Sequence, residues 1–233
     1  MQPPERLRSA AQHLDERLAS RLPRPVDADR GVRAGQRLGV GLLRLLYRAR
    51  VTGQAHVPSR GPVILVANHV GFIDGPLGFI TSPRPVHFLV KRAYFFGPVG
   101  WLLRGVGQIP ITQRSADREA LTSAREVLRA GGVVGVFPEG TRGSGEVASA
   151  QQGAAFLALG TKAVVVPVAL SGTAGRSKGA LPRVRSRLSV TFGEPFDLAG
   201  VPEVAAVTGR ERVAVATEAL RMRLAEHVRA ARI

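Results

Sequence analysis

Short apolar runs and helical patterns alternate along the chain from residue 51 onward. Continuous apolar runs are typical of strands that are buried on both faces of a sheet. The predicted strands are residues 62–67, 86–90, 107–111, 133–137, 163–170 and, with apolar and polar side chains alternating, 187–192. The predicted helices are residues 94–104, 116–130, 150–160 and 208–230. This alternation predicts an α/β fold with a mostly parallel central sheet flanked by helices.

The first 50 residues carry a different pattern, with two basic amphipathic segments at 5–22 and 31–48. In each segment apolar residues share one helical face and arginines surround it. Such helices are typical of proteins that bind membrane surfaces. Packing against the following domain would explain either helix equally well. We predict a membrane-facing amphipathic helical segment over 1–50 and one α/β domain over 51–233.

The amino-acid composition favours some kinds of partner and excludes several kinds of site. The chain contains 33 lysines and arginines against 17 aspartates and glutamates, which favours nucleic acid, acidic lipid headgroups or phosphate-bearing substrates as partners. Because cysteine is absent, a disulfide scaffold, a cysteine nucleophile and a cysteine-ligated metal site are excluded. No apolar run approaches the roughly 20 residues of a membrane-spanning helix, and no signal peptide pattern is visible. We therefore expect a soluble or peripheral protein.

The first candidate site, with Asn68, His69 and Asp74, directly follows the predicted strand 62–67, and α/β sheets bind ligands at such strand ends. On one continuous helix His69 and Asp74 would diverge by about 140°, but a turn at Gly71 would fold the carboxylate back under the imidazole. A carboxylate on one ring nitrogen leaves the other as a proton acceptor, so the pair would form a general base for an alcohol. Alternatively, Asp74 only caps a helix and His69 is a polar turn residue. A zinc site has little support, since no further ligand lies nearby at metal-ligand spacing.

The second candidate site also follows an apolar strand and reads Phe137-Pro138-Glu139-Gly140-Thr141-Arg142. Pro138 ends the strand, and Gly140 permits a sharp turn. The planar guanidinium of Arg142 would grip a phosphate, while Thr141 would add a hydroxyl donor. Glu139 would hold the loop in shape through hydrogen bonds. Taken alone, the segment would fit an ordinary polar loop better.

Two further cations stand at strand ends. Arg114 follows the strand 107–111, and Lys91 closes the strand 86–90. Because the ends of parallel strands share one edge of a sheet, these cations and the His69 base would converge there. Such a set suits the transfer of a group onto a hydroxyl of a phosphate-bearing acceptor.

Together these segments resemble the 1-acyl-sn-glycerol-3-phosphate acyltransferase family of glycerolipid synthesis. The segment from Asn68 and His69 to Asp74 is similar to the family's first block, and Phe137 to Arg142 is similar to its third. Gly107 to Arg114 is similar to its second block, and Val166-Pro167-Val168 to its fourth. The chain departs from the family pattern in having Lys91-Arg92-Ala93 in place of Lys-x-Glu, and Gln151-Gln152 where a basic residue is common.

The resemblance implies a reaction and a role for each residue. An acyl group would pass from acyl-CoA or acyl carrier protein to the free hydroxyl of 1-acylglycerol-3-phosphate, giving phosphatidic acid without a metal or other cofactor. His69 would be the base and Asp74 would orient it. The acceptor-phosphate site would comprise Arg114, Glu139, Gly140, Thr141 and Arg142, with Lys91 as a further cation. The family's N-terminal helices lie on the membrane, which implies a peripheral protein on the cytoplasmic face of the cell membrane, in contact with anionic lipids.

Two other classes of protein fit less well. A nucleic-acid binder would suit the charge, but the chain has no nucleic-acid motif, few aromatic residues for base stacking and no concentrated basic helix. A serine hydrolase would need a Gly-x-Ser-x-Gly elbow, whereas the nearest segment is Gly143-Ser144-Gly145. Within acyltransferases, the acceptor could also be another lysolipid, a polyol phosphate or a glycolipid sugar.

Overall fold

The computed structural model describes residues 28–112, 117–140, 146–177 and 179–231. Its centre is a seven-stranded sheet with the order β1-β7-β6-β2-β5-β3-β4. The strands are β1 (Arg48–Thr52), β2 (Val63–Ala67), β3 (Val86–Lys91), β4 (Ile109–Ile111), β5 (Val133–Val136), β6 (Val164–Ser171) and β7 (Arg187–Phe192). All neighbouring strands run parallel except β6 and β7, which are antiparallel. The predicted α/β fold with a mostly parallel sheet is therefore confirmed.

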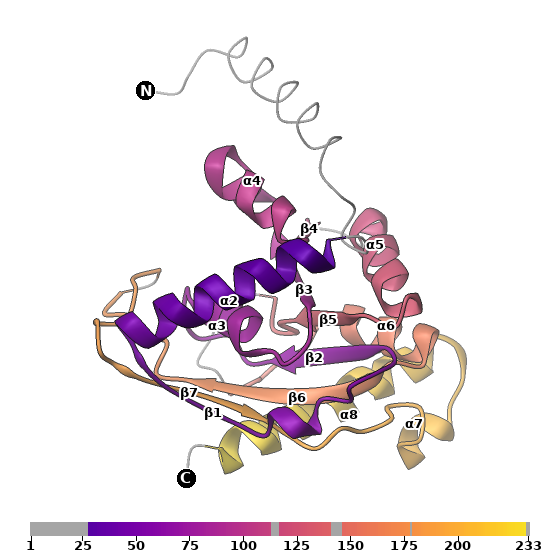
Figure 1. Ribbon diagram of the computed structural model, residues 1–233. Helices are drawn as coiled ribbons and strands as arrows, with labels where there is room; N and C mark the ends of the chain where they lie inside the picture. The colour runs from indigo at the N-terminus through magenta and orange to yellow at the C-terminus, as the bar shows by residue number, and fades with distance from the viewer. Residues whose placement is uncertain (1–27, 113–116, 141–145, 178, 232–233) are drawn as a thin grey trace, which may run out of the picture.

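Helices cover both faces of this sheet (Figure 1). One face carries α5 (Arg118–Arg129), α6 (Gly153–Thr161), α7 (Pro202–Ala205) and α8 (Gly209–Ala230), and the other carries α2 (Asp29–Leu46) and α3 (Asp74–Thr81). The central strand β2 contributes to the apolar core on both faces of the sheet, since all five of its residues are buried. Ile64 and Val66 belong to one apolar cluster, while Val63 and Leu65 belong to the other. This division follows from the alternation of side chains along a strand.

The helix α2 packs closely on its neighbours through a stripe of glycines. Gly31, Gly35 and Gly39 recur every four residues, so they share one face of the helix. A Cβ atom on Gly31 would lie 2.2 Å from the carbonyl oxygen of Gly105, and one on Gly39 would lie 2.5 Å from the side chain of Ile80. The stripe therefore lets α2 lie against α3 and the segment that ends at Gly105. Elsewhere on α2, the side chains of Leu38, Leu42 and Leu45 are exposed.

Several elements differ from the sequence predictions. The edge strand β1 was not predicted, because its alternating arginines continue the basic pattern of the helix before it. The short elements η2 (Gln54–His56) and α7 were also missed. The helix predicted over 94–104 is divided into η3 (Arg92–Tyr94) and α4 (Gly97–Gly105), since Gly97 takes a left-handed φ of 55°. The helix predicted over 5–22 lies outside the described residues.

The helix α4 projects beyond the sheet, on the side where α2 lies (Figure 1). Within α4 only Gly100 is buried. Its anchorage to the domain therefore depends on its two ends, including the contact between Gly105 and Gly31. None of the helices in the described ranges is both long and apolar enough to cross a bilayer.

The glycine stripe gives a test of how α2 is held. Gly31→Ala should lower the free energy of unfolding by about 1–3 kcal/mol, because the added methyl group collides with backbone at Gly105. Gly41→Ala is the matched control on the same helix, since a Cβ there meets nothing within 4 Å. It should be neutral or stabilise by up to about 1 kcal/mol through helix propensity. Urea unfolding of both variants provides the measurement. Equal effects of the two substitutions would contradict the close packing of α2.

Candidate active site

The site begins where β2 leaves the sheet, at the buried side chain of Asn68. The Asn68 Nδ2 donates to the carbonyl oxygen of Leu170 at 3.0 Å, and the Leu170 N–H donates to Asn68 Oδ1 at 2.8 Å. These two bonds join the end of β2 to β6, just beyond the last strand pair, Ala67 with Val168. Asn68 therefore fixes the point from which the following loop departs.

The loop after Asn68 closes on Asp74. Asp74 is the first residue of α3, and its side chain is fully buried. Its Oδ2 accepts from His69 Nδ1 at 2.9 Å and from the N–H groups of Val70 at 2.6 Å and Gly71 at 2.7 Å. The helix N-terminus also favours a negative charge at this position. The predicted turn at Gly71 is confirmed, and it brings the carboxylate back to the imidazole.

This contact defines the chemistry of the His69 ring. Because the carboxylate accepts at Nδ1, the hydrogen lies there in the neutral imidazole and Nε2 carries the lone pair. The His69 side chain is 21% exposed, so the ring is partly open to solvent while its partner Asp74 is not. A histidine in this state can take a proton from a hydroxyl that approaches Nε2.

The second candidate segment reaches the same loop through Glu139. The His69 N–H donates to Glu139 Oε1 at 2.9 Å, which joins the loop after β5 to the loop after β2. Burial raises the pKa of Glu139, while the hydrogen bond from His69 acts in the opposite direction. Gly140 has a left-handed φ of 69°, and a Cβ there would lie 2.3 Å from the Gln151 amide, so this turn requires glycine. Glu139 was predicted to hold its loop in shape through hydrogen bonds, and its partner in the structure is the His69 backbone N–H.

A stack of aromatic rings supports the imidazole. Phe137 stacks on His69 with ring centroids 4.4 Å apart, and Phe88 stacks on Phe137 at 5.3 Å. Phe88 occupies the space above Gly135, where a Cβ would come within 2.4 Å of the ring. Sequence reasoning placed Phe137 in the second candidate site but gave its ring no role, and it did not consider Phe88. A signal was present in Phe137, which stands two residues before Glu139, and in the glycine at 135 within an apolar strand.

The structure describes only one of the remaining predicted site residues, Lys91. Lys91 ends β3 at the edge of the sheet that carries His69, and its side chain is exposed. Arg114, Thr141 and Arg142 lie outside the described residues, so the predicted phosphate site stays a prediction. In the described part of the chain, no three histidine, aspartate or glutamate side chains gather in a way that could hold a metal ion.

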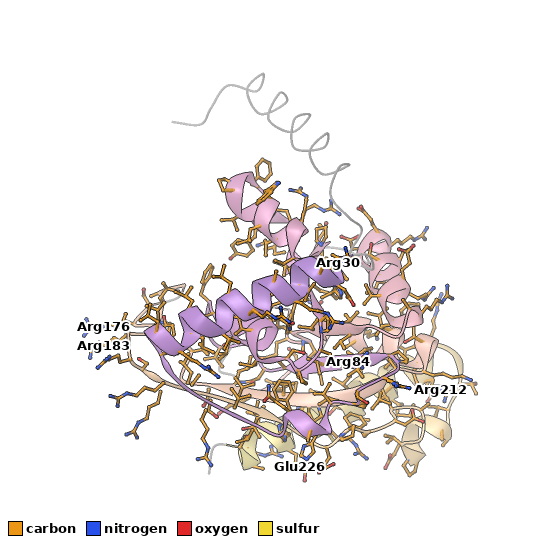
Figure 2. The ribbon with its side chains drawn as sticks, in the orientation of Figure 1. Arg30, Arg84, Arg176, Arg183, Arg212 and Glu226 are labelled. Atoms are coloured by element: carbon orange, nitrogen blue, oxygen red, sulfur yellow. The ribbon has the colours of Figure 1, made fainter. Side chains whose placement is uncertain are left out.

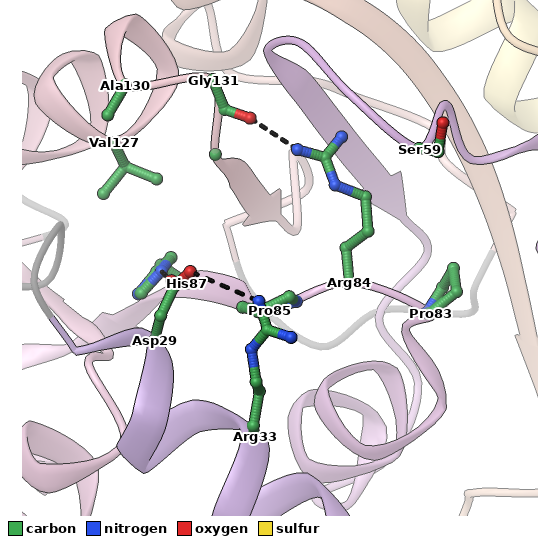
Figure 3. A pocket seen from close by; sticks show the side chains of 11 residues that line it. Asp29, Arg33, Ser59, Pro83, Arg84, Pro85, His87, Val127, Ala130 and Gly131 are labelled. Carbon is green, nitrogen blue, oxygen red and sulfur yellow. Dashed lines mark hydrogen bonds and ion pairs between the residues drawn. The ribbon is translucent and has the colours of Figure 1, made fainter.

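A cavity of about 350 Å³ opens at the opposite edge of the sheet, where strands begin (Figure 3). Its lining includes Asp29, Arg84 and His87. Arg84 donates to the carbonyl oxygens of Pro58 at 2.7 Å and Gly61 at 3.0 Å, so its guanidinium satisfies loop backbone. Burial lowers the pKa of both Arg84 and His87. This cavity lies at the opposite end of the parallel strands from the His69 loop and shares no residue with it.

The chain is similar to known proteins in sequence and in fold. The sequence model of the family described as Acyltransferase matches residues 48–171. The chain is 28% identical over 187 residues to a 1-acyl-sn-glycerol-3-phosphate acyltransferase of Bacillus subtilis, covering 79% of this chain and 90% of that protein. It is 35% identical over 130 residues to a lyso-ornithine lipid O-acyltransferase of Pseudomonas aeruginosa, covering 54% of this chain and 48% of that protein.

A solved structure shares the fold. The crystal structure of the 1-acyl-sn-glycerophosphate acyltransferase of Thermotoga maritima superposes with a TM-score of 0.67 and 26% sequence identity, covering 85% of this chain and 80% of that one. The residues matched by the family model run from β1 to the end of β6, and they include His69, Asp74 and Glu139. Because this match covers more than half of the sequence and contains the whole His69 loop, the chain belongs to the acyltransferase family.

Proposed function

We propose that this protein transfers a fatty acyl group from an acyl-CoA or acyl carrier protein thioester to the free hydroxyl of 1-acylglycerol-3-phosphate, giving phosphatidic acid. The observation that carries the proposal is the contact between His69 Nδ1 and Asp74 Oδ2 at 2.9 Å, which leaves Nε2 as the proton acceptor. The similarity to proteins named for this acceptor, in Bacillus subtilis and Thermotoga maritima, supports the choice of substrate.

The reaction follows from the state of the His69 ring. The acceptor hydroxyl gives its proton to Nε2 while its oxygen attacks the thioester carbonyl carbon. The tetrahedral intermediate then expels the sulfur, which takes the proton from the imidazolium and leaves as a thiol. One C–O bond forms and one C–S bond breaks, so the step balances without a metal or an acyl-enzyme. The Asp74 carboxylate stabilises the transient imidazolium and keeps the ring in one tautomer.

We assign the acceptor phosphate to the loop after β5, with Arg142 as its main ligand and Thr141 as a second donor. Arg114 and Lys91 are further candidates at neighbouring strand ends. Glu139 was grouped with these residues by family resemblance, but a carboxylate repels a phosphate. Its hydrogen bond from the His69 N–H supports a positioning role, in which Glu139 holds the backbone of the base.

A second candidate acceptor is another lysolipid, with the same mechanism. The similarity to a lyso-ornithine lipid O-acyltransferase favours this alternative. A radiolabelled acyl-CoA assay against lysophosphatidate, lyso-ornithine lipid, other lysolipids and a polyol phosphate decides between the two. The first proposal expects the highest kcat/KM with lysophosphatidate. Transfer to none of these acceptors, from either acyl-CoA or acyl carrier protein, would overturn the proposed function.

We place the protein at the surface of the cell membrane, on its cytoplasmic face, because an acceptor with one acyl chain resides in a bilayer. The exposed face of α2 supports this location. It carries Leu38, Leu42 and Leu45, while Arg37 and Arg44 on the same helix are also exposed. Anionic headgroups would attract the arginines, and the leucines would enter the acyl boundary.

The base assignment has a direct test. His69→Ala should lower kcat by about 10²–10⁴-fold with the fold retained, because the loss removes proton transfer. Asp74→Asn should also lower kcat strongly, because it favours the wrong imidazole tautomer. Circular dichroism establishes that each variant is folded. Near-full activity of a folded His69→Ala protein would rule out this mechanism.

A positioning role for Glu139 and a phosphate-binding role predict different kinetic changes. Glu139→Ala should lower kcat and leave the KM for the acceptor nearly unchanged, whereas Glu139→Gln should restore much of the rate, because an amide oxygen can still accept from the His69 N–H. Arg142→Ala should instead raise the KM for a phosphorylated acceptor and hardly alter the KM for the thioester. A rise in acceptor KM with unchanged kcat in Glu139→Ala would return Glu139 to the phosphate site.

The role of α2 is tested by replacing two of its exposed leucines. Leu42→Glu with Leu45→Glu should weaken co-sedimentation with anionic vesicles, since it removes apolar contacts and adds negative charge. Phe156→Glu with Met222→Glu is the charge-matched control, because these exposed side chains lie on α6 and α8, on the other face of the sheet. High salt should reverse the parent's binding only in part, as screening leaves the apolar term. Equal binding by both double variants would show that the membrane contact lies elsewhere.

A further inference from the structure

The projecting helix α4 and the residue before it expose large apolar side chains. Phe96, Val99, Trp101 and Leu102 are between 55% and 57% exposed. Within α4 only Gly100 is buried, and no helix or strand in the described ranges packs over these four side chains to shield them. Apolar surface gathered in this way marks a site of interaction on a soluble protein. We use the name α4 tip for these four residues.

The α4 tip continues to the His69 loop through two aromatic residues. Tyr94 in η3 is 40% exposed, and its ring meets the edge of Phe72 with centroids 6.2 Å apart. Phe72 is 44% exposed and lies in the loop between His69 and Asp74. These exposed side chains form a path that follows the chain from the α4 tip back to Tyr94 and crosses through the ring contact to the loop that holds His69.

Most of the exposed large apolar side chains lie on α2 or between Phe72 and the α4 tip. In the described ranges, the large apolar side chains that are exposed elsewhere are Phe156 and Met222, on α6 and α8. The others lie on α2, on the path from Phe72 to the α4 tip, or at Leu181 and Val184 in the loop after β6. Figure 1 shows α4 and α2 on the same side of the sheet, away from α7 and α8.

The charges within these segments are almost all positive, although Arg92 pairs with Glu119 at 2.7 Å. The described residues of 29–48, 91–104 and 172–186 contain 11 lysines and arginines and one acidic residue, Asp29. Figure 2 shows Arg176 and Arg183 extending outward at the end of the molecule where α2 finishes, and Arg30 at the other end of α2. A surface that is both apolar and basic matches a bilayer with anionic headgroups, which offers hydrocarbon beneath negative charge.

We propose that the α4 tip inserts into an anionic phospholipid bilayer, and that the path through Tyr94 and Phe72 leads the acyl-bearing acceptor from the bilayer to His69. The proposal rests on the proposed function for the identity of that acceptor. It adds a second membrane contact to the one proposed for α2. This second contact lies at the α4 tip, at the end of the path farthest from His69. Two contacts would fix the orientation of the protein on the membrane, with the carboxyl ends of the parallel strands toward the lipid.

The chain supplies its own probe of this contact, since Trp101 is its one tryptophan. The full chain is mixed with vesicles of phosphatidylcholine with phosphatidylglycerol, some carrying bromine on the acyl chains. Insertion of the α4 tip predicts a blue shift of Trp101 emission and quenching by the brominated chains, and a weaker effect with phosphatidylcholine alone. Protein that co-sediments with the anionic vesicles while Trp101 stays unshifted and unquenched would overturn the proposal. Emission that is already blue-shifted without vesicles and unchanged by them would also overturn it, since a second copy or another segment of this chain would then cover the tip.

Variants separate insertion from chemistry. Val99→Glu with Leu102→Glu retains Trp101 and should weaken vesicle binding by about tenfold or more, a change of about 1.4 kcal/mol or more. The Phe156→Glu with Met222→Glu control should bind like the parent. The α4 variant should lose acyl transfer to lysophosphatidate in vesicles but keep the parent's rate when the acceptor is dispersed in detergent. Loss of the rate in both settings by a folded variant would overturn the docking role.

The two proposals fail in different ways. If the parent transfers acyl groups to no lysolipid in detergent but Trp101 is quenched in anionic vesicles, the proposed function fails and the insertion of the α4 tip stands. If the parent is active in detergent but its Trp101 never meets the bilayer, the proposed function stands and the insertion fails.

Discussion

The arrangement of the site depends on one buried carboxylate. Asp74 sits at the start of α3 without access to water, and its Oδ2 collects hydrogen bonds from the His69 ring and from the N–H groups of Val70 and Gly71. A buried carboxylate without such partners would be strongly destabilising, so the loop must close around it for the protein to fold. The tautomer of the imidazole is therefore a product of folding, and it is in place before any substrate arrives.

Other contacts extend this constraint across the sheet. Asn68 ties the start of the loop to β6, Glu139 ties the His69 backbone to the loop after β5, and Phe137 packs against the face of the ring. Since these contacts involve β6 and the segment after β5 as well as the end of β2, the His69 ring is held on several sides by a rigid scaffold. Mutations that loosen the sheet at these ends should therefore affect the chemistry without touching the ring.

Much of this could be predicted from the sequence because the signals are local. The buried runs that became β2, β5 and β6 are continuous and apolar, and the return of Asp74 to His69 follows from a turn within six residues. The stacking of Phe137 on His69 is a long-range contact between residues that follow separate strands, so no local pattern specifies its geometry. The edge strand β1 was hidden because an exposed strand with alternating arginines resembles a continuing basic helix.

The glycine stripe of α2 has a consequence for the order of events in the cell. The helix contains four glycines in 18 residues, and each costs about 1 kcal/mol of helix propensity relative to alanine. A segment of this length and composition is unstable as a helix on its own in water. It becomes helical by docking on α3 and on the base of α4, whose residues follow it in the sequence. A nascent chain therefore does not display the leucine face of α2 until the domain behind it has been synthesised and folded, so this apolar face appears only on a folded protein.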